Sequence, residues 1–193
     1  MVNQLFSFRM GEFVVRYFGK AITEGNLEHA SATVTASVLV EAVTSIAAFG
    51  FLLLVAPLGA RFVAKDSGSL ILFQIFGLAI LSNLVTETAN GVLRVLNHYK
   101  VQGWITLIQS ILTFSMITLA FIFNGDVMTI LWAYLIGKIF LGFSPVIVAA
   151  IYMRKEVDSN WWQTKLTILP ALKDMTRFAV STNLSGTLKL VVS

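Results

Sequence analysis

The chain has 193 residues, of which 56% are hydrophobic and only 12% are charged, and its mean hydropathy is +0.80. A soluble domain carries about 25% charged residues, so this chain has too little polar surface for water, and its composition favours a membrane protein. It contains no cysteine and two histidines, which exclude a disulfide framework and argue against a metal site or other cofactor, and its net charge of +4 fits cytoplasmic loops better than a nucleic-acid partner.

The N-terminal segment, residues 1–26, carries a one-sided pattern of charge. Arg9, Glu12, Arg16 and Lys20 follow one another at helical spacings and share one face. One interpretation is an amphipathic helix on the cytoplasmic leaflet, with its cations at lipid headgroups. The other is the cytoplasmic end of a transmembrane helix and its following turn, which presents arginines to an anionic substrate.

Four apolar runs follow, and each is long enough to cross a bilayer once, because about 20 helical residues span the hydrocarbon core. We predict full spans near residues 31–58, 69–93, 103–124 and 127–152. Turn-forming residues separate the runs, and Asp126 stands where it would N-cap the last of them.

The two ends of the chain differ from a finished membrane protein. Residues 153–177 are expected to form a cytoplasmic connection, and the apolar stretch 178–193 is expected to be the truncated start of a further span. A membrane protein should not end inside a hydrophobic segment, so residues 1–193 are predicted to be a fragment that forms a single membrane domain.

Basic residues predict the orientation. Arg61 and Lys65 are the only two on one side of the predicted spans, whereas ten lie on the other. Because cytoplasmic loops collect Lys and Arg, both flanks are predicted to be cytoplasmic and the short hairpins external. Aromatic residues stand where a membrane interface is expected, namely Trp104, Tyr152, Trp161 and Trp162.

Polar residues inside the predicted spans fall on helix faces. Asn83, Glu87, Asn90 and Arg94 in the second span lie within about 60° of arc on one helix face. The first span carries Glu41 with neighbouring hydroxyl residues, the third carries Gln and Thr residues, and the fourth carries Lys138 alone. A charge at the bilayer centre costs about 2.5–3.5 kcal/mol, so these residues are expected to face a hydrated central cavity.

Structural explanations compete with the cavity. Ser, Thr, Asn and Gln side chains often join helices through hydrogen bonds worth about 0.6 kcal/mol each. Lys138 has an alternative role as the partner of Glu41 or Glu87 in a structural ion pair. Motifs of nucleotide binding, zinc proteases and serine hydrolases are absent, so an enzyme is not expected.

Three stretches resemble one known family. Phe13–Asn26 (FVVRYFGKAITEGN) looks like the end of its second helix, and Ala89–Thr113 (ANGVLRVLNHYKVQGWITLIQSILT) is similar to its fourth helix, basic loop and fifth helix. Met175–Ser193 (MTRFAVSTNLSGTLKLVVS) looks like the start of its seventh helix. The chain resembles the polysaccharide biosynthesis proteins, which are O-antigen-type flippases of the multidrug/oligosaccharidyl-lipid/polysaccharide exporter superfamily.

The resemblance implies an all-α, polytopic transmembrane helix bundle that forms part of the N-terminal lobe of a two-lobe transporter. The implied function is movement of a polyprenyl-pyrophosphate-linked oligosaccharide across the bacterial cytoplasmic (inner) membrane during surface polysaccharide synthesis. The implied partners are that lipid-linked oligosaccharide, membrane lipids and either the C-terminal lobe or other polysaccharide-assembly proteins.

Candidate substrate-binding residues come from two sources. Arg16 matches by position the arginine at the end of the family's second helix. The helix faces add six further residues that would line the cavity and contact pyrophosphate or sugar, namely Arg9, Asn83, Glu87, Asn90, Arg94 and Lys138. Glu41 and Glu87 are the candidates for coupling to an ion or proton.

Two other functions remain open at this point. A drug or cation antiporter of the same superfamily would use membrane carboxylates, and Glu41 and Glu87 are available. A scaffold or assembly subunit without transport activity is the second alternative. The sign of the cavity charge separates the two kinds of transporter, and the Arg9 and Arg16 face favours an anionic lipid substrate.

Overall fold

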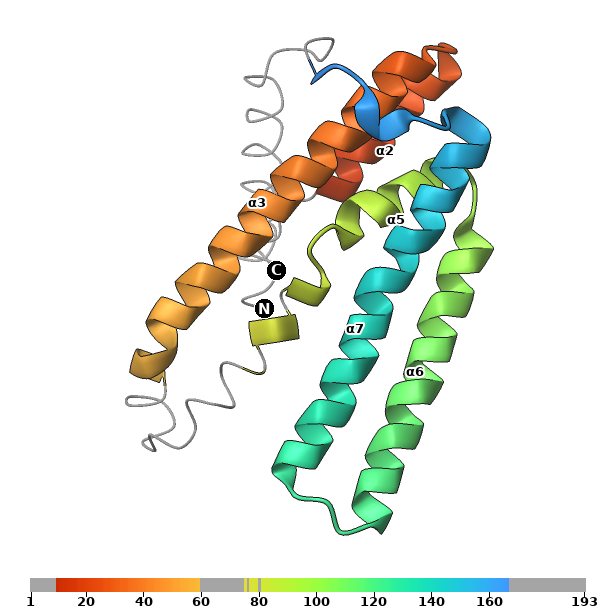
Figure 1. The fold of residues 1–193 in the computed structure, drawn as a ribbon. Helices are drawn as coiled ribbons and strands as arrows, with labels where there is room; N and C mark the ends of the chain where they lie inside the picture. The colour runs from red at the N-terminus through yellow and green to blue at the C-terminus, as the bar shows by residue number, and fades with distance from the viewer. Residues whose placement is uncertain (1–9, 60–74, 76, 80, 167–193) are drawn as a thin grey trace, which may run out of the picture. The chain divides into compact units, whose positions relative to one another are not determined.

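The computed structural model describes residues 10–59, 75, 77–79 and 81–166, and its regular elements are helical (Figure 1). No strand occurs in this part of the chain, which confirms the all-α prediction. Arg9 and the predicted segment 178–193 lie outside the described residues. In chain order the helices are α2 (Met10–Thr23), α3 (Leu27–Gly59), α5 (Thr86–Val95), α6 (Tyr99–Ile122) and α7 (Val127–Tyr152), followed by a π-helical turn (Met153–Val157) and a 3₁₀ turn (Trp161–Gln163).

Three helical segments among the described residues are long and apolar enough to cross a membrane. They are Leu27–Pro57 with 31 residues, Tyr99–Ile122 with 24 and Val127–Val157 with 31. Even the shortest extends about 36 Å at 1.5 Å per residue, more than the ~30 Å hydrocarbon core. These helices point to a membrane protein, and they occupy the positions of the first, third and fourth predicted spans.

Three helices end in the same left-handed turn. The residues that adopt it are Gly25 (φ 70°) after α2, Asn97 (φ 62°) after α5 and Asn124 (φ 52°) after α6. After α5, the His98 N–H returns to the Leu93 carbonyl at 2.8 Å, and equivalent bonds follow α2 and α6. Glycine and asparagine tolerate positive φ, so the sequence itself stops these helices.

Side-chain caps begin the two longest helices. The Asn26 Oδ1 accepts the His29 N–H at 3.0 Å at the start of α3. The Asp126 Oδ1 accepts the Thr129 N–H at 2.9 Å and the Thr129 hydroxyl at 2.7 Å, which confirms the predicted cap of α7. Hydrogen bonding from the Thr129 hydroxyl, followed by its N–H, holds the pKa of Asp126 below its usual value.

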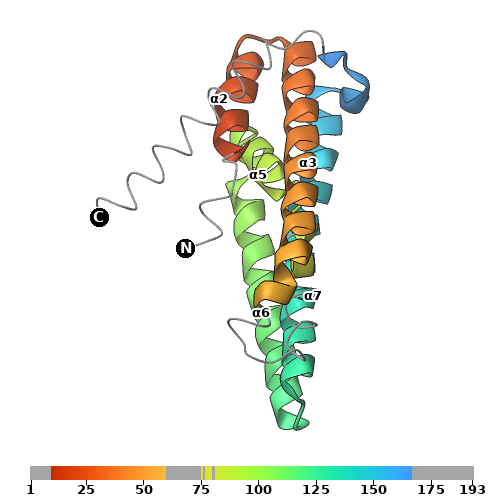
Figure 2. The ribbon, with the colours of Figure 1, turned by 90° about the vertical axis from the view of Figure 1, so that its left-hand side faces the viewer.

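The chain divides into two compact units. In the described residues the first unit contains 10–41, 87–98 and 148–166, and its core joins side chains from α2, α3, α5 and the end of α7. A glycine lets α2 and α5 approach closely (Figure 2). A Cβ built at Gly91 would lie 2.9 Å from the Val14 Cβ and 3.0 Å from the Gly11 carbonyl oxygen. The fully buried members of this core include Val14, Phe18, Thr33, Val92, Leu93 and Met153.

Aromatic and charged side chains join the ends of α5 and α7 in the first unit. The His98 ring stacks on Tyr152 with centroids 3.6 Å apart, and its Nε2 lies 2.9 Å from the Glu156 Oε1. The Arg154 guanidinium lies 4.6 Å from the centre of the Trp162 ring. These contacts gather two of the predicted interfacial aromatic residues, Tyr152 and Trp162, at one end of a helix long enough to span a membrane.

The second unit contains the described part of 42–86 together with 99–147. Here α6 and α7 run side by side (Figure 1). Gly137 of α7 faces Thr113 of α6 so closely that a Cβ would overlap the threonine hydroxyl. Large apolar side chains are exposed on this unit, as expected of a surface that faces lipid. Among them are Val43, Phe51, Leu54, Phe114, Phe121 and Phe143.

Candidate functional site

The second predicted span is a broken helix within its described residues. Residues 81–82 are helical, residues 83–85 form a turn, and α5 then begins at Thr86 (Figure 1). The Leu84 N–H returns to the Leu81 carbonyl at 3.2 Å, so the bond spans three residues instead of four. The helix within the predicted span 69–93 is therefore interrupted at this turn; residues 69–74, 76 and 80 lie outside the description.

The turn also corrects the predicted polar stripe. Glu87, Asn90 and Arg94 lie together on α5, but Asn83 precedes the turn and belongs to a different helical segment. The Asn83 Nδ2 donates to the Ala79 carbonyl at 3.1 Å, one turn back along its own segment. The predicted stripe depends on an unbroken helix. Residues Asn83–Val85 include neither Gly nor Pro, the residues that normally signal a break.

In the second unit, hydroxyl groups satisfy the backbone around the turn. The Ser45 hydroxyl of α3 donates to the Leu84 carbonyl at 3.3 Å, and the Thr86 hydroxyl donates to the Gly142 carbonyl of α7 at 3.2 Å. Gly142 is also required sterically, because a Cβ there would overlap the carbonyl oxygen of Ser82. A broken helix leaves backbone groups without intrahelical partners, and here neighbouring helices supply the partners.

In the first unit, a buried carboxylate caps the start of α5. The Glu41 Oε1 accepts the Glu87 N–H at 2.8 Å, and the Glu41 Oε2 accepts the Thr88 N–H at 2.8 Å. The side chain comes from α3, a distant part of the sequence, and only 5% of its surface is exposed. The carboxylate therefore satisfies two orphan donors and faces the positive end of the helix dipole.

The lengths of the helices place this break deep within the apolar segments. Glu41 stands near the middle of the 31-residue segment Leu27–Pro57, and Gly142 near the middle of the 31-residue segment Val127–Val157. The 10-residue α5 extends only about 15 Å, half of the hydrocarbon core. In each unit, the contacts of the break are thus made with the central part of a helix long enough to span the membrane.

An irregular backbone at this depth of a membrane is tolerated in only two settings. No water is present in the bilayer core, so broken helices persist only where protein covers them or where they line a water-filled cavity. Discontinuous helices of this kind are where transporters bind substrates and coupling ions. The break, with Asn83 exposed at the turn, is the candidate functional site of the described residues.

The remaining predicted residues are distributed over both units. In the first unit Arg16 is exposed on α2, with its guanidinium 5.6 Å from the centre of the Tyr17 ring. Arg94 is exposed and Asn90 half-buried on α5. In the second unit Lys138 is half-buried on α7, and its Nζ lies 5.4 Å from the centre of the Tyr134 ring one turn earlier.

Sequence reasoning missed the roles of Ser82, Thr86, Thr88 and Gly142. The cluster Ser82-Asn83 followed by Thr86 was a usable signal, since such polar residues are unusual inside an apolar run and favour turns. No local sequence pattern reveals the role of Gly142. Ser82, whose carbonyl oxygen leaves no room for a side chain at position 142, is distant in the sequence.

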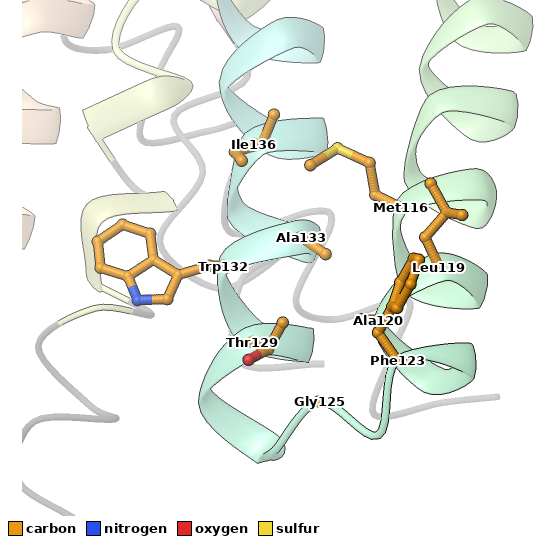
Figure 3. Close-up of a pocket in the computed structure, with 9 residues that line it drawn as sticks. All are labelled: Met116, Leu119, Ala120, Phe123, Gly125, Thr129, Trp132, Ala133 and Ile136. Carbon is orange, nitrogen blue, oxygen red and sulfur yellow. The ribbon is translucent and has the colours of Figure 1, made fainter.

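A hollow lies between α6 and α7 beside their connecting turn (Figure 3). It has a volume of about 510 Å³. Its lining is almost wholly apolar, and the hydroxyl of Thr129 is already donated to Asp126. The hollow suits a hydrocarbon chain and offers no charged group for a phosphate. Its lining residues are Met116, Leu119, Ala120, Phe123, Gly125, Thr129, Trp132, Ala133 and Ile136.

Comparison with known protein families, characterised proteins and solved structures finds no match for this chain. The class that the described residues define is a helical protein with three segments able to span a membrane.

Proposed function

We propose that this chain belongs to a membrane transporter, and that its substrate is a polyprenyl-pyrophosphate-linked oligosaccharide. The observation that carries the proposal is the helix break at residues 83–85, held by the middle of spanning helices. A protein that only anchors or scaffolds gains nothing from a broken span, which leaves backbone groups to be satisfied inside hydrocarbon. A transporter uses such a break to offer polar groups at the membrane midplane.

The choice of substrate rests on charge and on the sequence resemblance. A pyrophosphate and a sugar chain cannot cross hydrocarbon unshielded. Arg16 and Arg94 are exposed in the first unit, and an arginine fork can hold phosphate oxygens bidentately. The resemblance of Phe13–Asn26 and Ala89–Thr113 to lipid-linked oligosaccharide flippases supports the same substrate class. The excess of basic residues supports a bacterial cytoplasmic membrane location with both flanks cytoplasmic.

A flipping assay tests the proposal directly. The purified protein is reconstituted into vesicles that contain a fluorescent polyprenyl-pyrophosphate oligosaccharide in both leaflets, and an impermeant reductant then bleaches the outer leaflet. Flipping brings inner-leaflet lipid to the reductant, so we expect nearly complete bleaching. Bleaching that stops at about half, as in protein-free vesicles, would contradict the proposal.

The same assay tests Arg16. We expect Arg16→Ala to slow flipping about 10-fold, equivalent to about 1.4 kcal/mol, because one phosphate contact is lost. Arg16→Lys should be intermediate, since lysine keeps the charge but not the planar fork. Lys20→Ala is the matched control: Lys20 is an exposed cation on the same helix, 3.7 Å from Glu24. Equal rates for Arg16→Ala and wild type would remove Arg16 from the substrate path.

Glu41 favours a second candidate, antiport of a cationic solute. It is the one buried charged side chain in the described residues, and membrane carboxylates are the usual partners of cations and protons. Vesicles loaded with a lipophilic cation separate the two candidates. Uptake of the cation without flipping of the anionic lipid would select antiport, and neither activity would leave the scaffold alternative.

A further inference from the structure

We propose that Glu41 is a proton-binding latch, whose carboxylate holds the start of α5 in place and whose protonation releases it. The role of this latch in transport rests on the proposed function, but the latch itself does not. Sequence reasoning assigned coupling to Glu41 and Glu87 together, and the structure separates them. The Glu41 side chain is buried and bonded to backbone, whereas the Glu87 side chain is exposed and contributes its backbone N–H.

The cap of α5 uses both oxygens of the Glu41 carboxylate. Each carboxylate oxygen of Glu41 accepts one N–H at 2.8 Å, so both oxygens are in use as acceptors on α5. A proton from water would add to a remaining lone pair of one oxygen and convert it to a hydroxyl, which removes the negative charge and leaves a weaker acceptor for the backbone N–H. The neutral carboxyl group also loses its attraction to the positive end of the α5 dipole. Protonation therefore weakens the cap.

Among the described residues, the surroundings of Glu41 contain no second buried carboxylate that could replace it as the cap of α5. The charged residues on the other described elements of its unit are all exposed, so none of them replaces the carboxylate as a buried acceptor. The nearest like charge along α5 is Glu87, directly at the capped end. These exposed groups are Glu12, Arg16 and Lys20 on α2, Glu87 and Arg94 on α5, and Arg154, Lys155 and Glu156 after α7; Glu28, on α3 itself, is exposed as well.

The consequence falls on α5 because both N–H groups that Glu41 accepts belong to its first turn. An orphan N–H at membrane depth cannot be satisfied by lipid, so the freed end must move or admit water. Binding of the proton and capping of the helix are reciprocally linked, as any two events coupled through one group must be. Protonation at Glu41 is thereby converted into loosening of the helix break.

Hydrogen exchange on the purified full chain tests the latch without any transport. The amides of residues 86–90 are compared at pH 8 and pH 5.5, after correction for the intrinsic pH dependence of exchange. The protection factors of these amides in wild type should fall at least about 10-fold at the lower pH. In Glu41→Gln they should be low at both pH values. Glu28→Gln, on the same helix as Glu41, should exchange as wild type does.

Several outcomes would overturn the latch. Equal protection of wild type at both pH values contradicts it even if Glu41→Gln fails to fold, because that comparison needs no variant. Protection in Glu41→Gln equal to wild type at pH 8 also contradicts it.

The flipping assay then separates the latch from the proposed function. Flipping that depends on pH in wild type and in Glu28→Gln, but not in Glu41→Gln, supports both. Exchange as predicted without any flipping retains the latch and rejects the substrate. Flipping by wild type that does not change with pH rejects the role of the latch in transport.

Discussion

Replacing Gly142 by alanine is expected to cost about 3 kcal/mol of stability, the upper end of the usual cost of overpacking. The added methyl group would overlap the Ser82 carbonyl oxygen, which belongs to backbone and cannot rotate away. The movement that relieves this overlap must also stretch the hydrogen bond from the Thr86 hydroxyl to the Gly142 carbonyl. Thermal unfolding of the purified protein in detergent measures the loss.

Gly103 supplies the matched control for this substitution. It also lies within a helix of the second unit, but no atom stands within 4 Å of a Cβ built there. Gly103→Ala should be neutral or stabilising by up to about 1 kcal/mol, because alanine loses less backbone entropy in a helix. Equal effects of the two substitutions would mean that α7 does not contact the helix break as described.

Replacing Gly91 by leucine is expected to separate α2 from α5 and destabilise the first unit by about 2–3 kcal/mol. A Cβ at this position already meets the Val14 Cβ at 2.9 Å and the Gly11 carbonyl oxygen at 3.0 Å. Val14 is completely buried, so its side chain has no free space into which to move. Small residues at helix contacts in membranes serve this close approach.

The control for Gly91 lies in the same pair of helices. A Cβ at Gly19 would lie 3.6 Å from the nearest atom, a methyl group of Val95, which is ordinary van der Waals contact. Gly19→Ala should therefore unfold within about 1 kcal/mol of wild type. If Gly91→Leu unfolds at the wild-type temperature, the close contact of α2 with α5 is contradicted.

The parts of the fold that local sequence determines were predictable. Apolar runs long enough to span a membrane appear as α3, α6 and α7 at the expected positions. The cap at Asp126 was visible because a capping side chain acts on its own helix, three residues away. The turns at Asn97 and Asn124 follow from the tolerance of asparagine for positive φ.

The candidate site was only partly predictable, because it depends on contacts between distant segments. Glu41 and the hydroxyl residues near it, Ser45 among them, are unusual in an apolar run, and their spacing predicts a cavity lining. The structure gives both of them backbone groups of the helix break as hydrogen-bond partners. A pattern of single residues along one helix cannot reveal that the partner is the main chain of another.

We expect the break at residues 83–85 to lie at mid-membrane depth and to face water, as the proposed transport function requires. The chain contains no cysteine, so a nitroxide can be attached at Asn83→Cys without further changes. Ile111→Cys is the reference: this residue is 57% exposed and lies near the middle of the spanning helix Tyr99–Ile122. In bilayers, collisions of each nitroxide with oxygen and with a water-soluble nickel chelate are measured by electron paramagnetic resonance. The account predicts that the nickel chelate reaches residue 83 far more often than residue 111, although both are at mid-depth. Equally rare nickel collisions at the two positions would contradict it.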